Sequence, residues 1–180
     1  MSEYKILVTG TTGAGKTTAI AAVSDIPPVS TDVRNTDPGV AKALTTAGMD
    51  YGELTLDNGE KLRLYGTPGQ ARFDFMWRIL ARRALGVVVL IDNSQPDPLA
   101  DLDMYLRGFA ELIADAACVV GIGRMDTHAQ PDLEAFATRL QARGVLCPVV
   151  PVDVRERAQV VQLLDLLLLQ IEARTESEER

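Results

Sequence analysis

Short apolar runs alternate along the chain with segments in which apolar residues recur at helical spacing. The apolar runs predict strands over 4–9, 85–92, 117–123 and 145–153, and the periodic segments predict helices over 15–23, 72–84, 99–114, 131–143 and 155–173. This alternation is typical of crossover units that feed a mainly parallel sheet covered on both faces. The pattern therefore predicts an α/β protein, a three-layer α/β/α sandwich.

Two further strands, over 49–56 and 61–65, are separated by Asp57-Asn58-Gly59-Glu60. The Asn-Gly step suits a tight hairpin, so the two strands are expected to pair antiparallel. The sheet would then have six strands, mostly parallel, with one antiparallel strand at its edge.

A long irregular stretch over 25–46 carries Pro27, Pro28, Pro38 and Gly39 among polar residues. A loop of this length inside a compact domain is usually functional or mobile, so it is a candidate switch segment. A chain of 180 residues suits one domain, expected over 1–174 with a polar tail over 175–180.

The charge and the cysteines limit the classes of function. A net charge of -7 argues against nucleic acid or anionic lipid as the partner, because both favour basic patches. Cys118 and Cys147 lie in apolar, strand-like stretches and are expected to be free thiols in a reducing compartment. With no recognisable signal peptide and no apolar run long enough to span a bilayer, the expectation is a cytoplasmic protein without direct membrane insertion.

The most specific motif is Gly10-Thr11-Thr12-Gly13-Ala14-Gly15-Lys16-Thr17, which matches the phosphate-binding loop G-x-x-x-x-G-K-S/T between a predicted strand and a predicted helix. The glycines let backbone N–H groups curl around an anion. Lys16 would place a positive charge at the β- and γ-phosphates, and the Thr17 hydroxyl suits Mg²⁺. With Thr18 beside it, the loop predicts a nucleotide site. It leaves open whether the nucleotide is GTP or ATP.

Two segments carry a resemblance to a known family. The run 64–73, which contains Gly66-Thr67-Pro68-Gly69-Gln70 and Arg72-Phe73, resembles the second switch of Ras-like GTPases, and 46–51 is similar to the end of the first switch in Rab-type members. The Gly-Thr-Pro-Gly-Gln version is most similar to the bacterial MglA-like group and its actinobacterial relatives, often called ATP/GTP-binding proteins. The resemblance implies a P-loop G domain that binds GTP or GDP with Mg²⁺.

The resemblance also implies roles for individual residues. Gln70 would orient the attacking water, and the Gly69 backbone N–H would sense the γ-phosphate. Thr46 would join Thr17 as a Mg²⁺ ligand when the first switch closes. Arg34 would act as an internal arginine finger, the alternative being a solvated loop arginine. Lys16, Gln70 and Arg34 are thus the predicted catalytic residues.

The guanine-reading motif Asn/Thr-Lys-x-Asp is present only in altered form, as Gly123-Arg124-Met125-Asp126. Asp126 would accept hydrogen bonds from guanine N1–H and N2–H₂, which adenine lacks, and Arg124 would lie over the base. The resemblance further implies a backbone N–H to guanine O6 within the run Pro151-Val152-Asp153-Val154, with Val152 and Asp153 as the candidate residues.

Gly66 stands where most GTPases keep an aspartate that holds a Mg²⁺-bound water. Weaker Mg²⁺ binding is therefore expected, unless Asp32, Asp37 or Asp50 supplies the missing carboxylate. The aromatic residues of the 72–84 helix are either core residues or a partner contact.

The sequence favours a small GTPase that hydrolyses GTP slowly and switches a protein partner, for which the family suggests a small roadblock-type dimer. Two alternatives remain: a nucleotide-binding regulatory module with little or no hydrolysis, and an ATP-binding P-loop phosphotransferase. Gln70 favours the GTP-hydrolysing switch over the regulatory module.

Overall fold

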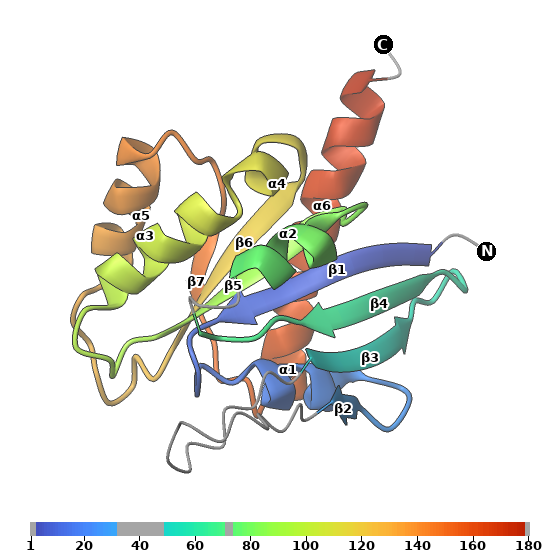
Figure 1. The fold of residues 1–180 in the computed structure, drawn as a ribbon, viewed down its shortest axis with the longest axis horizontal. Coiled ribbons are helices and arrows are strands. Elements are labelled where there is room, and N and C mark those ends of the chain that lie inside the picture. Colours follow the sequence, from blue (N-terminus) through green and yellow to red (C-terminus); the bar gives the residue numbers. More distant parts are fainter. Residues whose placement is uncertain (1–2, 32–48, 71–73, 179–180) are drawn as a thin grey trace.

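In the part of the chain that the structure describes, the strands form one mixed sheet of seven, in the order β2-β3-β4-β1-β5-β6-β7 (Figure 1). The structure is a computed structural model that describes residues 3–31, 49–70 and 74–178. The strands are β1 (Glu3–Gly10), β2 (Val29–Thr31), β3 (Met49–Thr55), β4 (Lys61–Gly66), β5 (Gly86–Asp92), β6 (Ala117–Gly123) and β7 (Val149–Pro151). Strands β4, β1, β5, β6 and β7 pair in parallel.

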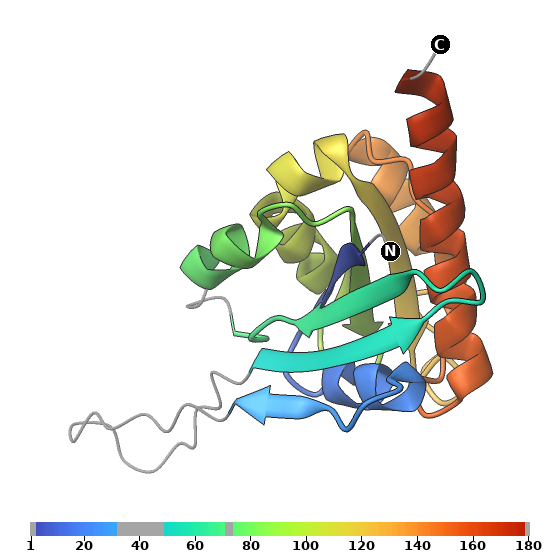
Figure 2. The same cartoon turned by 90° about the vertical axis from the view of Figure 1, so that its right-hand side faces the viewer.

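Helices cover both faces of the sheet, which confirms the predicted sandwich (Figures 1 and 2). They are α1 (Lys16–Val23), α2 (Asp74–Ala81), α3 (Pro98–Gly108), α4 (Ala110–Asp115), α5 (Leu133–Ala142) and α6 (Arg157–Glu178). Helices α1 and α6 share one hydrophobic core with the sheet, and α2 to α5 share the other. Among the described residues, no helix combines the length and apolar character needed to cross a membrane.

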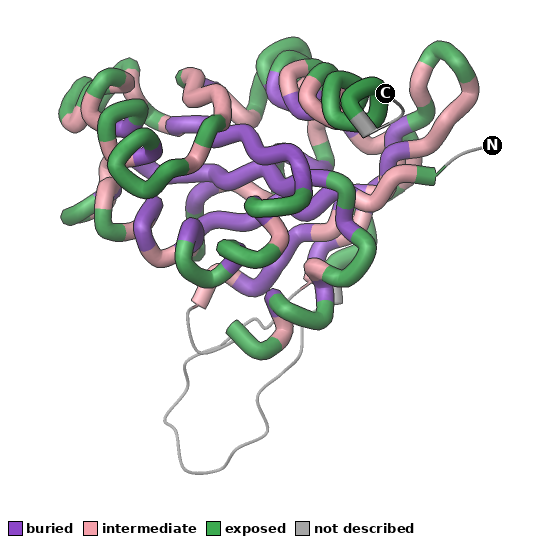
Figure 3. The backbone as a smooth tube through the Cα atoms, turned by 90° about the horizontal axis from the view of Figure 1, so that it is seen from above, coloured by how far each residue is buried: buried purple, intermediate pink, exposed green. Residues whose placement is uncertain are grey.

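Alternating side chains of the central strands supply the two cores. In β1, Ile6 and Val8 belong to the α1/α6 core, while Leu7 belongs to the opposite core. Every residue of β5 is buried, because a central parallel strand is covered on both faces. The tube coloured by burial shows these strands running through the centre of the molecule (Figure 3).

The predicted count of six strands is wrong, and so is the edge position of the antiparallel strand. Strand β2 pairs antiparallel with β3, which also runs antiparallel to β4. Among the described strands, the one antiparallel to its neighbours is therefore β3. It is the second strand from the edge, and β2 is the edge strand. Three residues are too few to show a period in a sequence that is interrupted by Pro27 and Pro28, so β2 left no recognisable pattern.

Other boundaries also differ from the prediction. The helix expected over 99–114 is broken at Phe109, whose backbone leaves the helical region at φ -111° and ψ 19°. At the break, a Cβ on Gly108 would lie 2.7 Å from the Trp77 ring, so the indole packs directly on the backbone. The last strand is shorter than predicted, and α6 continues to Glu178, beyond the expected end at 173.

The predicted free thiols are confirmed, with Cys118 buried and Cys147 half-buried. Arg34, Thr46, Arg72 and Phe73 lie outside the described residues.

Candidate nucleotide site

The phosphate-binding loop connects β1 to α1 at the carboxyl ends of the parallel strands, which is the usual ligand side of an open α/β sheet. Gly13 and Gly15 adopt φ values of 83° and 98°, in a region that side chains disfavour. The Ala14 N–H donates to the Thr11 carbonyl at 3.0 Å inside the loop. The glycine positions of the motif are thus required by the loop's own backbone conformation.

The Lys16 ammonium is held by carbonyl groups of the same loop. Its Nζ donates to the Gly10 oxygen at 2.6 Å and to the Thr11 oxygen at 2.9 Å. Burial lowers the pKa of Lys16 to about 8, although the negative charge of Asp50 acts in the opposite direction. A half-buried cation with a lowered pKa favours an anionic ligand, because a phosphate beside it would stabilise the charge that partial burial disfavours.

The Thr17 hydroxyl contacts a carboxylate that comes from another part of the chain. Thr17 Oγ1 donates to Asp50 Oδ2 at 2.6 Å, and Ser30 Oγ donates to the other carboxylate oxygen at 2.9 Å. Asp50 is 6% exposed, so its carboxylate is buried beside the first helical turn after the loop. Helix α1 and strands β2 and β3 together fix this arrangement.

Asp50 occupies the space that a side chain at position 66 would need. The two residues are direct partners in the β3–β4 ladder. A Cβ added at Gly66 would lie 3.0 Å from Asp50 Cβ and 3.2 Å from Asp50 Oδ2. Of the three acids considered as replacements for the missing aspartate, Asp50 therefore lies at the site, while Asp32 and Asp37 fall outside the described residues.

The second glycine turn packs against the phosphate-binding loop. A Cβ at Gly69 would lie 2.6 Å from the Thr12 nitrogen and 2.8 Å from Lys16 Nζ, so only glycine fits here. The turn is also held from outside, because Tyr105 Oη donates to the Gly69 carbonyl and Trp77 Nε1 donates to the Pro68 carbonyl, both at 2.9 Å.

Two aromatic residues of α2 have different surroundings, which answers the open question for each. Trp77 is 1% exposed and packs on Phe109 with ring centroids 5.2 Å apart, so it is a core residue. Phe75 is 59% exposed and stays available for a partner. Gln70 is half-buried in the turn before this helix, and its side chain forms no hydrogen bond with the described part of the chain.

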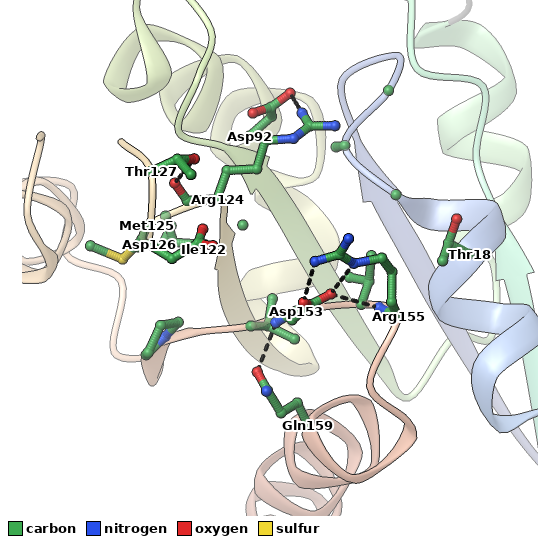
Figure 4. Close-up of a pocket in the computed structure, with 17 residues that line it drawn as sticks. Thr18, Asp92, Ile122, Arg124, Met125, Asp126, Thr127, Asp153, Arg155 and Gln159 are labelled. Atoms are coloured by element: carbon green, nitrogen blue, oxygen red, sulfur yellow. Dashed lines mark hydrogen bonds and ion pairs between the residues drawn. The ribbon is translucent and has the colours of Figure 1, made fainter. Parts of the chain in front are cut away.

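A cavity of about 740 Å³ extends from the phosphate-binding loop along the ends of β5, β6 and β7 (Figure 4). Its volume lies in the range of small-molecule and cofactor pockets. The lining residues are Gly13, Ala14, Gly15, Thr18, Asp92, Ile122, Gly123, Arg124, Met125, Asp126, Thr127, Pro151, Val152, Asp153, Val154, Arg155 and Gln159. The altered guanine motif and the last strand thus meet the loop in one cavity.

Arg124 directs its guanidinium toward Asp92 (Figure 4). Its Nη1 donates to Asp92 Oδ2, and the Arg124 backbone has a positive φ of 61°. Burial raises the pKa of Asp92, but hydrogen bonds from Ser94, Arg124 and Gln95 outweigh burial and lower the pKa to about 2. The head of Arg124 is therefore engaged by Asp92, and its stem lines the cavity.

The backbone N–H groups expected to read guanine O6 are already engaged. The Val152 N–H donates to the Ile122 carbonyl at 2.9 Å, and the Asp153 N–H donates to Gln159 Oε1 at 2.7 Å. Val154 also lines the cavity, and its N–H donates to no acceptor among the described residues. Within the candidate run 151–154, Val154 is therefore the residue whose backbone donor is left available by the described structure.

Two carboxylates of the cavity, those of Asp153 and Asp126, differ in whether a neighbouring side chain binds them. Arg155 holds the Asp153 carboxylate through Nε at 2.9 Å and Nη2 at 2.7 Å (Figure 4), and hydrogen bonds from Arg155 lower the pKa of Asp153 to about 2. Asp126 is exposed and accepts no hydrogen bond from the described residues. Asp126 is therefore the lining acid that stays available to a base.

Sequence reasoning missed Asp92, Arg155 and Gln159 as cavity residues. Asp92 and Arg155 lie at or just beyond the carboxyl end of a predicted strand, where parallel strands place ligand-facing groups, whereas Gln159 lies in the first turn of α6. The position at the end of a strand was the one feature of the sequence that could have identified cavity residues of this kind.

Comparison with known proteins shows which proteins this chain is similar to. No protein-family model matches the chain. The Ras-related protein RabC of Dictyostelium discoideum is 26% identical over 176 residues, which cover 94% of this chain and 84% of that protein. The chain is a weak homologue of the Ras and Rab small GTPases. At the level of the family, this homology supports a small GTP-binding switch protein and suggests GTP hydrolysis.

Two partial matches agree with this homology. The Ras-related protein Rab-10 of Diplobatis ommata is 28% identical over 111 residues, which cover 60% of this chain and 50% of that protein. An uncharacterized protein of Methanocaldococcus jannaschii is 35% identical over 93 residues, which cover 52% of this chain and 53% of that protein. Nothing in these relatives is specific to the MglA-like group, so that finer resemblance stays a prediction.

Proposed function

We propose that the protein is a GTP-binding switch that hydrolyses GTP slowly to GDP. The observation that carries the proposal is one continuous arrangement around the nucleotide cavity. Lys16, Thr17 and Asp50 lie at the phosphate end, and Asp126 lies in the lining at the base end. The homology to Ras and Rab proteins supports the same assignment.

The residues around Thr17 fit a Mg²⁺ ion. In this proposal the Thr17 hydroxyl is a direct ligand, with Thr46 as the second, and Asp50 holds a metal-bound water in place of an acid at position 66. Mg²⁺ accepts few protein ligands and keeps several waters, so one hydroxyl with an anionic neighbour is a suitable donor set. When bound, the ion would neutralise charge on the phosphates.

The chemistry requires positioning and charge rather than a covalent intermediate. Lys16 supplies positive charge at the β- and γ-phosphates, and Gln70 orients the attacking water. Arg34 is the proposed internal arginine finger. Because the Gln70 side chain is half-buried and has no hydrogen bond with the described residues, it has freedom to turn toward a water.

Guanine is selected in this proposal by Asp126 and by the Val154 N–H. The carboxylate accepts from N1–H and N2–H₂, and the backbone donates to O6. Adenine presents the opposite polarity at the equivalent edge and would leave both protein groups without a partner on the base.

The switch itself would be the turn that contains Gly69. This turn touches the phosphate-binding loop on one side and continues into α2, where Phe75 and Ile79 are 59% and 57% exposed. A γ-phosphate that reorders the turn would therefore change the surface of α2. We propose this surface as the contact for a regulatory protein, with a roadblock-type dimer as the candidate.

The test is a parallel titration of nucleotide-free protein with GTP, GDP and ATP, with phosphate release followed in the same samples. We expect GTP and GDP to bind more tightly than ATP and phosphate to be released slowly. Tighter binding of ATP would refute guanine selection, and binding without phosphate release would refute hydrolysis in favour of a regulatory module. Asp126→Ala should reduce the GTP preference, while Asp57→Ala in the distant hairpin should leave it unchanged.

A further inference from the structure

A second cavity, of about 500 Å³, lies at the opposite end of the sheet from the nucleotide cavity. Strand β6 connects the two places, because Cys118 near its start lines this cavity and its last residues, Ile122 and Gly123, line the other. The walls come from α3, α4, the segment between α5 and β7, and the distal half of α6. The nucleotide chemistry uses none of these residues.

The lining of this second cavity is positively charged. It contains Arg107, Arg143 and Arg174 and, among the described residues, no acidic side chain. In a chain with a net charge of -7, such a cluster runs against the overall balance. A local excess of positive charge attracts an anion even on an acidic protein.

Two of these arginines have no fixed partner in the described structure. Arg143 Nη2 pairs with Asp103 at 3.0 Å, whereas Arg107 and Arg174 form no ion pair or hydrogen bond with the described residues. The charge of Arg174 nevertheless acts on Cys118: a hydrogen bond with Cys147 and burial raise the pKa of Cys118, and Arg174 opposes them. Arg174 therefore lies close to the floor of the cavity.

The remaining surface of the cavity is apolar. Leu106, Ile113 and Cys118 are all less than 10% exposed and form its inner wall. Leu146 lies at the rim of the same cavity and is 92% exposed, so it adds apolar surface next to the inner wall. A ligand with an apolar body would cover Leu146 and fill the space above the inner wall.

We propose that this cavity binds a small amphipathic carboxylate, with its acid group on Arg107 and Arg174 and its apolar body against Leu106, Ile113 and Leu146. Guanidinium groups bind carboxylates through two parallel N–H···O bonds, which gives both strength and orientation. The same groups accept phosphate, so the test includes a phosphate of equal chain length. The site is independent of the nucleotide assignment.

The test uses sodium octanoate as the probe and the full chain labelled with ¹⁵N. Octanoate at ~10 mM, well above a millimolar dissociation constant, should shift the amide signals of Cys118, Leu146 and Arg174 and leave those of the phosphate-binding loop in place. Octylamine and acetate should produce no such shifts, because one lacks the acid and the other lacks the apolar body. Absence of shifts with octanoate, or equal shifts with octylamine, would overturn the proposal.

Variants identify the groups that hold the acid. Arg107→Gln and Arg174→Gln remove exposed side chains that have no partner among the described residues, so both should fold and bind nucleotide as before. Each should weaken octanoate binding about tenfold, while Arg82→Gln, an exposed arginine elsewhere, should not. Unchanged affinity in both variants would contradict the assignment. Tighter binding of octyl phosphate than of octanoate would refute the preference for a carboxylate.

Discussion

Asp50 lies directly opposite Gly66 across the β3–β4 ladder, and its carboxylate fills the space that a side chain at position 66 would enter. The carboxylate accepts a hydrogen bond from Thr17, the hydroxyl that the phosphate-binding motif assigns to Mg²⁺. An acid is therefore present beside the proposed metal position, although it comes from the neighbouring strand.

Removing the carboxylate should weaken metal binding. We expect Asp50→Asn to lower Mg²⁺ affinity by about 10–100-fold, because residues that orient a metal's ligands contribute in that range. Release of a fluorescent GDP analogue, measured against Mg²⁺ concentration, gives the affinity directly. Asp57→Asn, in the exposed hairpin, is the matched control. Equal Mg²⁺ dependence in the Asp50 variant and the native protein would remove Asp50 from the metal site.

Exchanging the two residues tests whether the carboxylate or its strand matters. Gly66→Asp alone should impair nucleotide binding, since its Cβ would lie 3.0 Å from Asp50 Cβ and would bring a second negative charge. The double variant Asp50→Gly with Gly66→Asp removes the clash and should recover part of the Mg²⁺ dependence. The same titration measures both proteins. A double variant no better than Gly66→Asp alone would show that the two positions are not interchangeable.

The lowered pKa of Lys16 predicts a pH dependence of nucleotide affinity. Above a pKa of about 8 the free protein loses the ammonium charge, so GDP affinity should fall between pH 7 and pH 9. Calorimetry at pH 9 in buffers of different ionisation enthalpy should show proton uptake on binding, because phosphate raises the pKa of Lys16 again. Lys16→Gln should show neither effect. Binding without proton uptake at pH 9 would contradict this interpretation.

The same shift has the opposite sign for stability. Lys16 has a pKa of about 8 in the folded protein and an ordinary value of 10.5 when unfolded, so the unfolded chain binds more protons between these values. The contribution of Lys16 should therefore make the protein without nucleotide more stable as pH rises from 8 to 10.5. Urea unfolding of the native protein and Lys16→Gln over this window isolates that contribution as their difference. A difference that falls with pH would contradict the assigned shift.

Trp77 should report the state of the second turn. It is the single tryptophan of the chain, and its indole N–H donates to the Pro68 carbonyl. We expect its fluorescence to differ between the complexes with GDP and with a non-hydrolysable GTP analogue. Identical spectra in the two complexes would argue that the turn does not move.

The Tyr105 hydroxyl should stabilise the same turn. Tyr105→Phe removes the hydrogen bond to the Gly69 carbonyl and should lower the free energy of unfolding by about 1 kcal/mol. Urea denaturation followed through Trp77 measures the change. Tyr4→Phe is the control, because it removes a hydroxyl far from the turn. It should leave the difference in Trp77 fluorescence between the two nucleotide complexes unaltered.

The parts of the fold that are fixed by neighbouring residues could be predicted from the sequence. Strand β6 has the bounds expected for it, and the β1–loop–α1 unit follows from one motif. Strand β2 could not be predicted, because its pairing depends on backbone groups of β3 that lie about twenty residues away. The break at Phe109 likewise depends on the Trp77 ring, which comes from another helix.

The candidate site divides in the same way. The phosphate end was predictable because the loop is a local sequence motif. The identity of the compensating acid was not, since Asp50 and Gly66 are 16 positions apart and only the strand register brings them together. The preference for Val154 over Val152 and Asp153 depends on which N–H groups are already bonded, and a sequence does not contain that information.

The position of Asp50 also bears on ancestry. If the acid moved between adjacent strands during evolution, a lineage changing one residue at a time passed through a protein with two carboxylates at the site or with none. Searches for distant relatives that demand an acid in the second-switch motif would overlook chains of this kind, whereas a pattern that accepts either strand would include them.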